Sequence, residues 1–151
     1  MRNAIGIVVA VGLLAVIAFV FYAIFEMSRT SPAAIGQRRI LQRLLDRVPP
    51  PPHALVLRRF DVSRASIASV GESIDANSGQ NVVYLYYWTK LQRLGWKQCG
   101  APADPNAIPD QNYFVKPPYE AVLAFQPDAP QRYDFQLEWQ AKPLAAPGRC
   151  S

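Results

Sequence analysis

The stretch NVVYLYYWTKLQRLGW, Asn81–Trp96, places five aromatic rings within sixteen residues. Its valines and rings favour a strand, but its length and its 3.6-residue spacing favour a helix, and length is the better criterion. Gly95 follows the last apolar position, as glycine commonly does where a helix ends. On a helical wheel most apolar side chains share an arc of about 140°: Val83, Tyr84, Tyr87, Trp88, Leu91 and Leu94. We therefore expect these rings to fill a core against a sheet rather than to form a binding platform.

Three apolar side chains of the same stretch fall outside that arc: Val82, Leu85 and Tyr86. Because they cannot face the core with the others, they are candidates for a second, partner-facing contact. Leu85 and Tyr86 are the residues for which we expect this role.

The segments around this helix have the composition of strands. The last of them alternates, with Tyr133, Phe135, Leu137 and Trp139 on one face and polar residues on the other. Such alternation predicts an antiparallel sheet with one dry face, covered by helix on a single side. The expected strands are 54–60, 65–74 with a bulge at Gly71, a short strand ending at Cys99, 112–116, 119–126 and 133–140. The sequence thus predicts an α+β, two-layer fold with one helix packed on one face, in the order β-β-α-β-β-β-β.

Residues Ala4–Phe25 contain no charge, Asn, Gln or Pro. About 20 apolar residues suffice for a helix to cross a bilayer, so this segment predicts a transmembrane anchor within residues 1–27. A cleaved signal peptide is the alternative, but its apolar region is shorter, roughly 7 to 15 residues, and the small-x-small site that follows, Ser31-Pro32-Ala33, is a poor one because it contains a proline. We therefore expect a single-pass, uncleaved signal anchor.

The orientation of this anchor is read from arginines and cysteines. Arg2 precedes the span whereas several arginines follow it, and that bias favours a cytoplasmic C-terminal part. Cys99 and Cys150 are the only cysteines, and one disulfide between them suits an oxidising compartment, two unrelated free thiols being the alternative. A long domain crosses largely regardless of charge. We expect residues 53–151 to form a domain outside the cytoplasmic (inner) membrane, in the periplasm or beyond.

Between anchor and domain, residues 28–52 predict a basic amphipathic helix and a proline-rich spacer. Ser31 is a cap residue, Pro32 suits the first turn, and Pro49–Pro52 end the helix. The apolar arc holds Ile40, Leu41, Leu44, Leu45 and Val48, and the opposite face holds Arg38, Arg39, Arg43 and Arg47. These arginines would contact anionic headgroups if the helix lies on the bilayer. Alternatively, the leucines pack on the domain or on a helix of a partner protein.

The remaining composition argues against several classes of function. The net charge of +5 is concentrated before residue 65, and Lys is absent before residue 90, which is unlike a basic nucleic-acid-binding face. His53, the only histidine, follows four prolines, and with two distant cysteines it makes neither a zinc site nor a hydrolytic triad. We expect no enzyme activity, no metal and no cofactor.

The sequence Leu91-x-x-Leu94-Gly95-Trp96, followed by the antiparallel segments 112–126 and 133–140, resembles small bacterial envelope-anchored proteins, many of them lipoproteins, that lack an assigned activity. The resemblance covers about residues 49–140. It implies anchoring outside the cytoplasmic membrane and supplies no catalytic residues. The chain departs from the lipoprotein pattern because it has an apolar span and no acylated cysteine.

These observations predict a membrane-anchored envelope protein whose domain acts as an interaction or assembly accessory module, with the lipid bilayer and an envelope protein as partners. The alternative is a module that binds a small molecule, lipid or glycan between the sheet and loop 100–112. A hydrolase is the third hypothesis.

Overall fold

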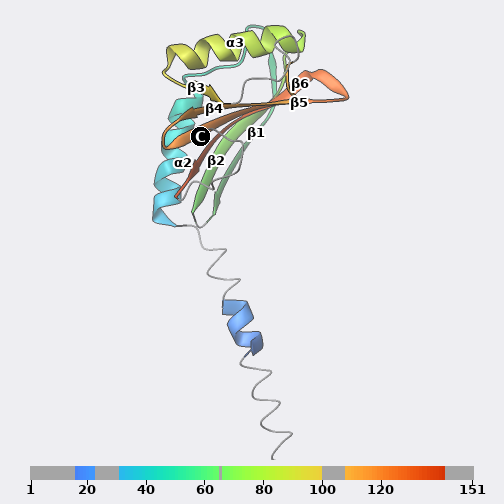
Figure 1. The fold of residues 1–151 in the computed structure, drawn as a ribbon. Coiled ribbons are helices and arrows are strands. Elements are labelled where there is room, and N and C mark those ends of the chain that lie inside the picture. Colours follow the sequence, from blue (N-terminus) through green and yellow to red (C-terminus); the bar gives the residue numbers. More distant parts are fainter. Residues whose placement is uncertain (1–15, 23–30, 65, 100–107, 142–151) are drawn as a thin grey trace, which may run out of the picture.

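The computed structural model describes residues 16–22, 31–64, 66–99 and 108–141 (Figure 1). From residue 31 onward it shows an α+β fold, which confirms the predicted class. The elements that follow the helix at residues 32–45 have the order β-β-α-β-β-β-β, which is also as predicted. The elements are α2 (Pro32–Leu45), β1 (Leu55–Arg64), β2 (Ile67–Asp75), α3 (Gln80–Arg93), β3 (Lys97–Cys99), β4 (Gln111–Lys116), β5 (Tyr119–Gln126) and β6 (Ala129–Gln140).

Within the described ranges, no helix is both long enough and apolar enough to cross a membrane. Residues 16–22 are helical. The rest of the predicted span, residues 4–15 and 23–25, lies outside the described residues.

The six strands form one antiparallel sheet in the order β1-β2-β6-β5-β4-β3. Hairpins join β1 to β2, β4 to β5 and β5 to β6, and the pairing of β2 with β6 brings the first hairpin beside the last strand. The Pro117–Pro118 peptide bond in the β4–β5 turn is cis. Strand β1 and the short strand β3 are therefore the two outer strands of the described sheet.

One face of the sheet carries the core, and the predicted alternation of β6 explains it. Tyr133, Phe135 and Leu137 are fully buried, and their register partners on β2 and β5 are also buried, all of them apolar except Glu72. Tyr87 of α3 stacks on Phe135 with ring centroids 4.4 Å apart, which places α3 on this face. The inward arc predicted for α3 is confirmed, because Val83, Tyr87 and Leu91 are fully buried and the other three members are half-buried.

Helix α2 lies on the same face as α3, so two helices cover the sheet where one was predicted (Figure 1). Its buried residues Leu41 and Leu45, and Val48 just after it, belong to the same core as the strands. The Tyr119 hydroxyl of β5 donates to Gln37 Oε1 at 3.0 Å. The segment predicted as a linker before residue 53 is thus part of the domain, because apolar side chains on α2 complete the core that α3 covers only in part.

The ends of both helices follow from local chemistry. Ser31 caps α2, its hydroxyl oxygen accepting from the Ala34 amide at 3.1 Å, as predicted. Gly95 has a φ of 82°, a conformation in which a Cβ is unfavourable. The amides of Gly95 and Trp96 donate to the carbonyls of Gln92 and Leu91, which is the Schellman arrangement that ends a helix at glycine.

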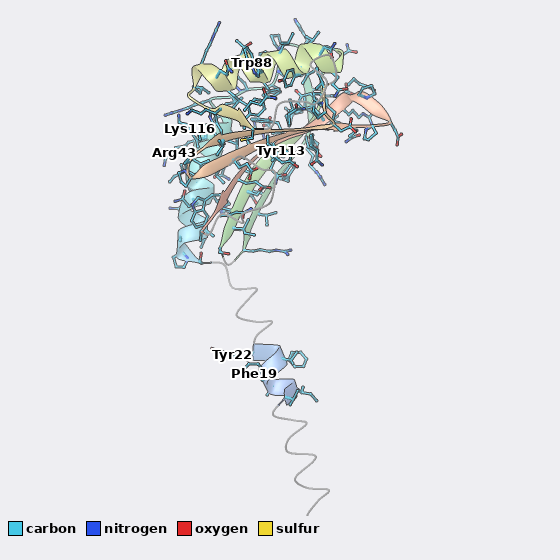
Figure 2. The ribbon with its side chains drawn as sticks, viewed as in Figure 1. Phe19, Tyr22, Arg43, Trp88, Tyr113 and Lys116 are labelled. Carbon is cyan, nitrogen blue, oxygen red and sulfur yellow. The ribbon has the colours of Figure 1, made fainter. Side chains whose placement is uncertain are left out.

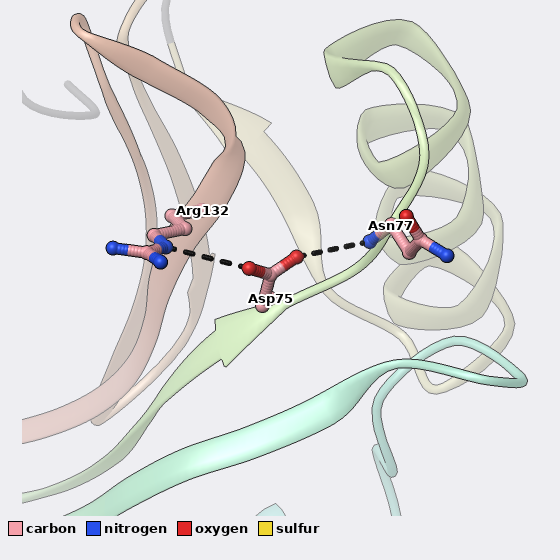
Figure 3. A network of polar contacts seen from close by, with 3 residues as sticks. All are labelled: Asp75, Asn77 and Arg132. Carbon is pink, nitrogen blue, oxygen red and sulfur yellow. Dashed lines mark hydrogen bonds and ion pairs between the residues drawn. The ribbon is translucent and has the colours of Figure 1, made fainter.

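The connection from β2 to α3 is fixed by one aspartate (Figure 3). Asp75 Oδ1 accepts from the Asn77 amide at 3.2 Å, and Asp75 Oδ2 accepts from Arg132 Nε of β6 at 3.3 Å. Asn77 has a φ of 51°, which asparagine tolerates better than most residues. The carboxylate therefore turns the chain out of β2 and holds it to β6 at the same time.

Gly71 does not form the predicted bulge. It pairs in regular register with Phe60 on β1 and Gln136 on β6, whereas the irregularity lies between Val56 and Arg58. An added Cβ at Gly71 would lie 2.5 Å from Phe60 Cζ and 2.7 Å from the Phe135 carbonyl oxygen. Glycine is required here by the close approach of its neighbours.

Candidate interaction surface

The outward face of α3 contains a hollow of about 630 Å³. Val82 and Leu85, 60% and 57% exposed, contribute large apolar side chains to it. Its lining residues are Val82, Leu85, Tyr86, Thr89, Lys90, Arg93 and Leu94. Thus the residues that the helical wheel left outside the core, among them the predicted contacts Leu85 and Tyr86, lie together in one surface feature.

Tyr86 is held in place by one contact at its hydroxyl and one at its ring. Its hydroxyl donates to the Pro49 carbonyl oxygen at 2.8 Å, and its ring meets the Tyr87 ring edge-on at a centroid distance of 5.3 Å. The first contact fastens the proline segment against α3. Tyr86 is therefore half-buried and forms a preformed wall of the hollow rather than a free side chain.

The electrostatic character of the hollow is positive. Lys90 Nζ lies 5.5 Å from the centroid of the Tyr86 ring and 3.4 Å from its hydroxyl oxygen. Arg93 is exposed one turn further on, and the sequence of α3 contains no acidic residue. An apolar floor with two cations at its rim favours a ligand that combines apolar groups with carboxylates.

A second feature is a set of exposed arginines on α2 and in the turn that follows it. Arg39 and Arg43 are exposed and four residues apart, so they lie above one another on the helix, with Arg43 on the solvent side in Figure 2. Arg47 is exposed in the turn that follows the helix. Arg38 does not join them. Its guanidinium faces β1, with Nη1 3.5 Å from Asp61 Oδ2. The structure therefore leaves three of the four predicted contact arginines exposed.

The sequence patterns missed an ion pair between a buried carboxylate on β2 and an exposed guanidinium on β1. Glu72 Oε1 of β2 lies 2.7 Å from Arg59 Nε of β1, its register partner. Glu72 occupies a core position between Val70 and Ile74, and that alternation was a signal that its side chain would face inward. The basic partner was not identifiable, because the register of β1 depends on the irregularity near residue 57.

Two buried tyrosines lie beside this pair. The hydroxyl oxygens of Tyr87 and Tyr133 are 3.4 Å apart. Burial, and to a lesser extent the neighbouring tyrosine and Glu72, raises the pKa of Tyr87 far above its ordinary value. Burial also raises the pKa of Tyr133. Both groups therefore remain neutral hydroxyls at physiological pH.

The other predicted chemistry is placed as follows. His53 is exposed in the loop after the prolines, with a φ of 68°. Among the described residues, no three His, Cys, Asp or Glu side chains are grouped closely enough to hold a metal ion. Cys99 ends β3, but Cys150 lies outside the described residues, so the disulfide stays a prediction.

Comparison with known proteins adds no further assignment: no protein-family model matches the chain, and no curated protein or solved structure shows significant similarity to it.

Proposed function

We propose that this protein is a single-pass, membrane-anchored envelope protein whose α+β domain docks a partner protein on the outward face of α3. The hollow around Leu85 is the observation that carries the proposal. The preferred occupant is an amphipathic segment that inserts apolar side chains beside Val82 and Leu85 and directs carboxylates at Lys90 and Arg93.

The case for docking rests on exposure and preformation. The apolar side chains of Val82 and Leu85 are exposed to water, with which they make no favourable interaction. A contiguous apolar surface with a polar rim is a common feature of protein contacts. Tyr86 is already fixed by Pro49 and by Lys90, so little side-chain freedom would be lost on binding. Aromatic and basic side chains also dominate the energetics of such contacts.

The anchor is proposed from the apolar segment Ala4–Phe25, with the domain outside the cytoplasmic membrane. Only residues 26–31 separate this segment from α2, and at about 3.5 Å per residue they span at most about 20 Å. The N-terminal end of α2 would then stay close to the bilayer. Because Leu41 and Leu45 of α2 are buried in the domain, we propose that this region contacts the membrane through Arg39, Arg43 and Arg47, on anionic headgroups.

Site-specific photocrosslinking tests the docking face. A photoreactive amino acid at Leu85 of the full chain in native membranes should give one discrete crosslinked product. The same group at Gln92, which is exposed on α3 but does not line the hollow, should give none. The double change Lys90→Glu and Arg93→Glu should abolish the product at Leu85. Equal crosslinking at the two positions, or none at either, would refute docking at this face.

Two further measurements separate the alternatives. A reporter that is active in only one compartment, fused after Ser151, should place the C-terminus outside the cytoplasm; a cytoplasmic signal would overturn the proposed location. If the hollow instead binds a small molecule, lipid or glycan, the purified chain should show a ligand-dependent rise in melting temperature that Leu85→Asp removes, without any crosslinked protein.

A further inference from the structure

Strand β1 forms one edge of the described sheet and is unusually open for an outer strand. It has ten residues, whereas β3 at the other edge has three. Leu55 is 64% exposed, and Leu57 and Val62 are also exposed. An outer strand presents a row of backbone N–H and C=O groups toward solvent and is a template for pairing with another strand.

The side chains of β1 have a self-complementary order. Arg59 and Asp61 lie on the helix-covered face, since their register partners Glu72 and Val70 do, and Phe60 lies on the opposite face beside Gly71. We propose that β1 pairs antiparallel with β1 of a second copy of this chain, in a register centred on Phe60. Each Arg59 then faces Asp61 of the second copy, and the two Phe60 rings face each other.

The neighbouring registers are less favourable. The two copies are related by a twofold axis. If the helices of both copies lie on the same side of the joined sheet, this axis passes between two identical residues, so one residue of β1 faces its own copy in every allowed register. Centring on Arg59 or on Asp61 would place like charges directly opposite, which is destabilising. Centring on Val62 removes the Arg59–Asp61 pairs. Two opposite-charge pairs and an aromatic pair therefore favour the Phe60 register.

The structure leaves room for this contact. The side chains of Arg59 and Asp61 are 70% and 46% exposed although each has a partner within its own chain. A hollow of about 440 Å³ lies between α2 and β1, lined in part by Arg59, Phe60 and Asp61, so this stretch of the edge is open to solvent although Arg38 of α2 reaches Asp61. Arg59 would then lie between Glu72 of its own chain and Asp61 of the second copy.

Cysteine crosslinking of the full chain in mild detergent tests the register. Residues directly opposite in an antiparallel pair have Cα atoms about 4.5 to 5.5 Å apart, within the range of a disulfide. Phe60→Cys should therefore give a covalent dimer after mild oxidation. Val62→Cys should not, because its two copies would lie about 13 Å apart along the strands.

A mixture keeps the test independent of the Phe60 ring. Chains carrying Arg58→Cys and chains carrying Val62→Cys should form a disulfide with each other when they are mixed. Neither variant should crosslink alone. The parent, which retains Cys99 and Cys150, should give no covalent dimer. Light scattering should show that the parent is a dimer, and Asp61→Arg should raise the dissociation constant of that dimer at least tenfold. A parent chain that stays monomeric at about 100 µM, where a weak contact of this kind would still be populated, would overturn the proposal, and self-linking of Val62→Cys would overturn its register.

Discussion

Arg59 Nε lies 2.7 Å from Glu72 Oε1, joining a guanidinium that is 70% exposed to a carboxylate that is 3% exposed. The two residues are register partners on β1 and β2. Glu72 lies among the core residues of the helix-covered face. The exposed guanidinium of Arg59 therefore compensates the buried charge of Glu72, and removing Arg59 should destabilise the interior around Glu72.

Arg59→Met should lower the free energy of unfolding by about 2 kcal/mol, because it leaves a buried carboxylate without its partner. The loss is placed below the range for fully buried pairs because solvent reaches Arg59 and screens the interaction. Urea denaturation of the full chain in mild detergent measures it. Arg64→Met, an exposed change on the same strand, should stay within about 0.5 kcal/mol.

The double variant Arg59→Met with Glu72→Met identifies the cause. If the charge of Glu72 produces the loss, removing both partners should recover most of the stability, since an apolar pair replaces an ion pair at little cost. A double variant as unstable as Arg59→Met alone would show that the packing of the arginine stem, and not its charge, is what matters.

The buried pair Tyr87 and Tyr133 should make the domain sensitive to alkaline pH. The pKa of each tyrosine is raised above the ordinary value of 10.0 by burial, so the folded state holds the two protons more tightly than the unfolded state. Their contribution to stability is complete below pH 10 and is lost as the pH rises beyond it. Stability against urea should fall above pH 10 as the absorbance of tyrosinate rises.

Tyr87→Phe provides the control for this pH dependence. It removes one titrating hydroxyl and the 3.4 Å contact to Tyr133 but keeps the ring stacked on Phe135. At neutral pH the cost should be about 1 kcal/mol. Above pH 10 the variant should lose stability more gradually than the parent, and an unchanged slope would contradict the assignment to Tyr87.

The fold could be anticipated wherever one face of an element is apolar. The burial of Tyr87 and Phe135 followed from periodicity alone, because spacing determines which side chains share a face. The position of α2 did not follow. Its leucines are equally compatible with a bilayer, a partner or a sheet, and only the three-dimensional arrangement shows that α3 leaves part of the sheet for α2 to cover.

The candidate site could be anticipated in part for the same reason. Leu85 was singled out because it lies off the apolar arc of α3, and the structure gives it a hollow with Lys90 and Arg93 at the rim. The diversion of Arg38 to Asp61 was not foreseeable, since it depends on which strand lies beside α2. The interpretation of Gly71 as a bulge was wrong because close packing, like a bulge, selects glycine.

Ser31→Ala should destabilise the domain by about 1 kcal/mol, because the Ala34 amide loses the hydroxyl that accepts from it. Ser31→Asp should retain the cap. It should also raise the free energy of unfolding by about 0.3 kcal/mol, since the first turn of α2 contains no acidic residue to interact with the helix dipole. Equal stability of the alanine and aspartate variants in urea denaturation would show that the cap contributes nothing.

Gly36 in α2 provides a control for substitutions of glycine. A Cβ added there meets no atom within 4 Å, and the residue lies in the interior of a helix. Gly36→Ala should therefore raise the free energy of unfolding by about 0.5 to 1 kcal/mol, the difference in helix propensity between the two residues.

Gly71→Ala should have the opposite effect, lowering the free energy of unfolding by about 1 to 3 kcal/mol through overpacking. The added methyl would meet the Phe60 ring, which lies at an edge and can move, and the Phe135 carbonyl oxygen, which belongs to the backbone of a central strand and cannot. Phe60→Ala in the Gly71→Ala background should for that reason give no recovery. Measured by urea denaturation beside Gly36→Ala, a neutral or stabilising Gly71→Ala would show that β6 can shift away from β2, contrary to the tight pairing that the register of these two strands requires.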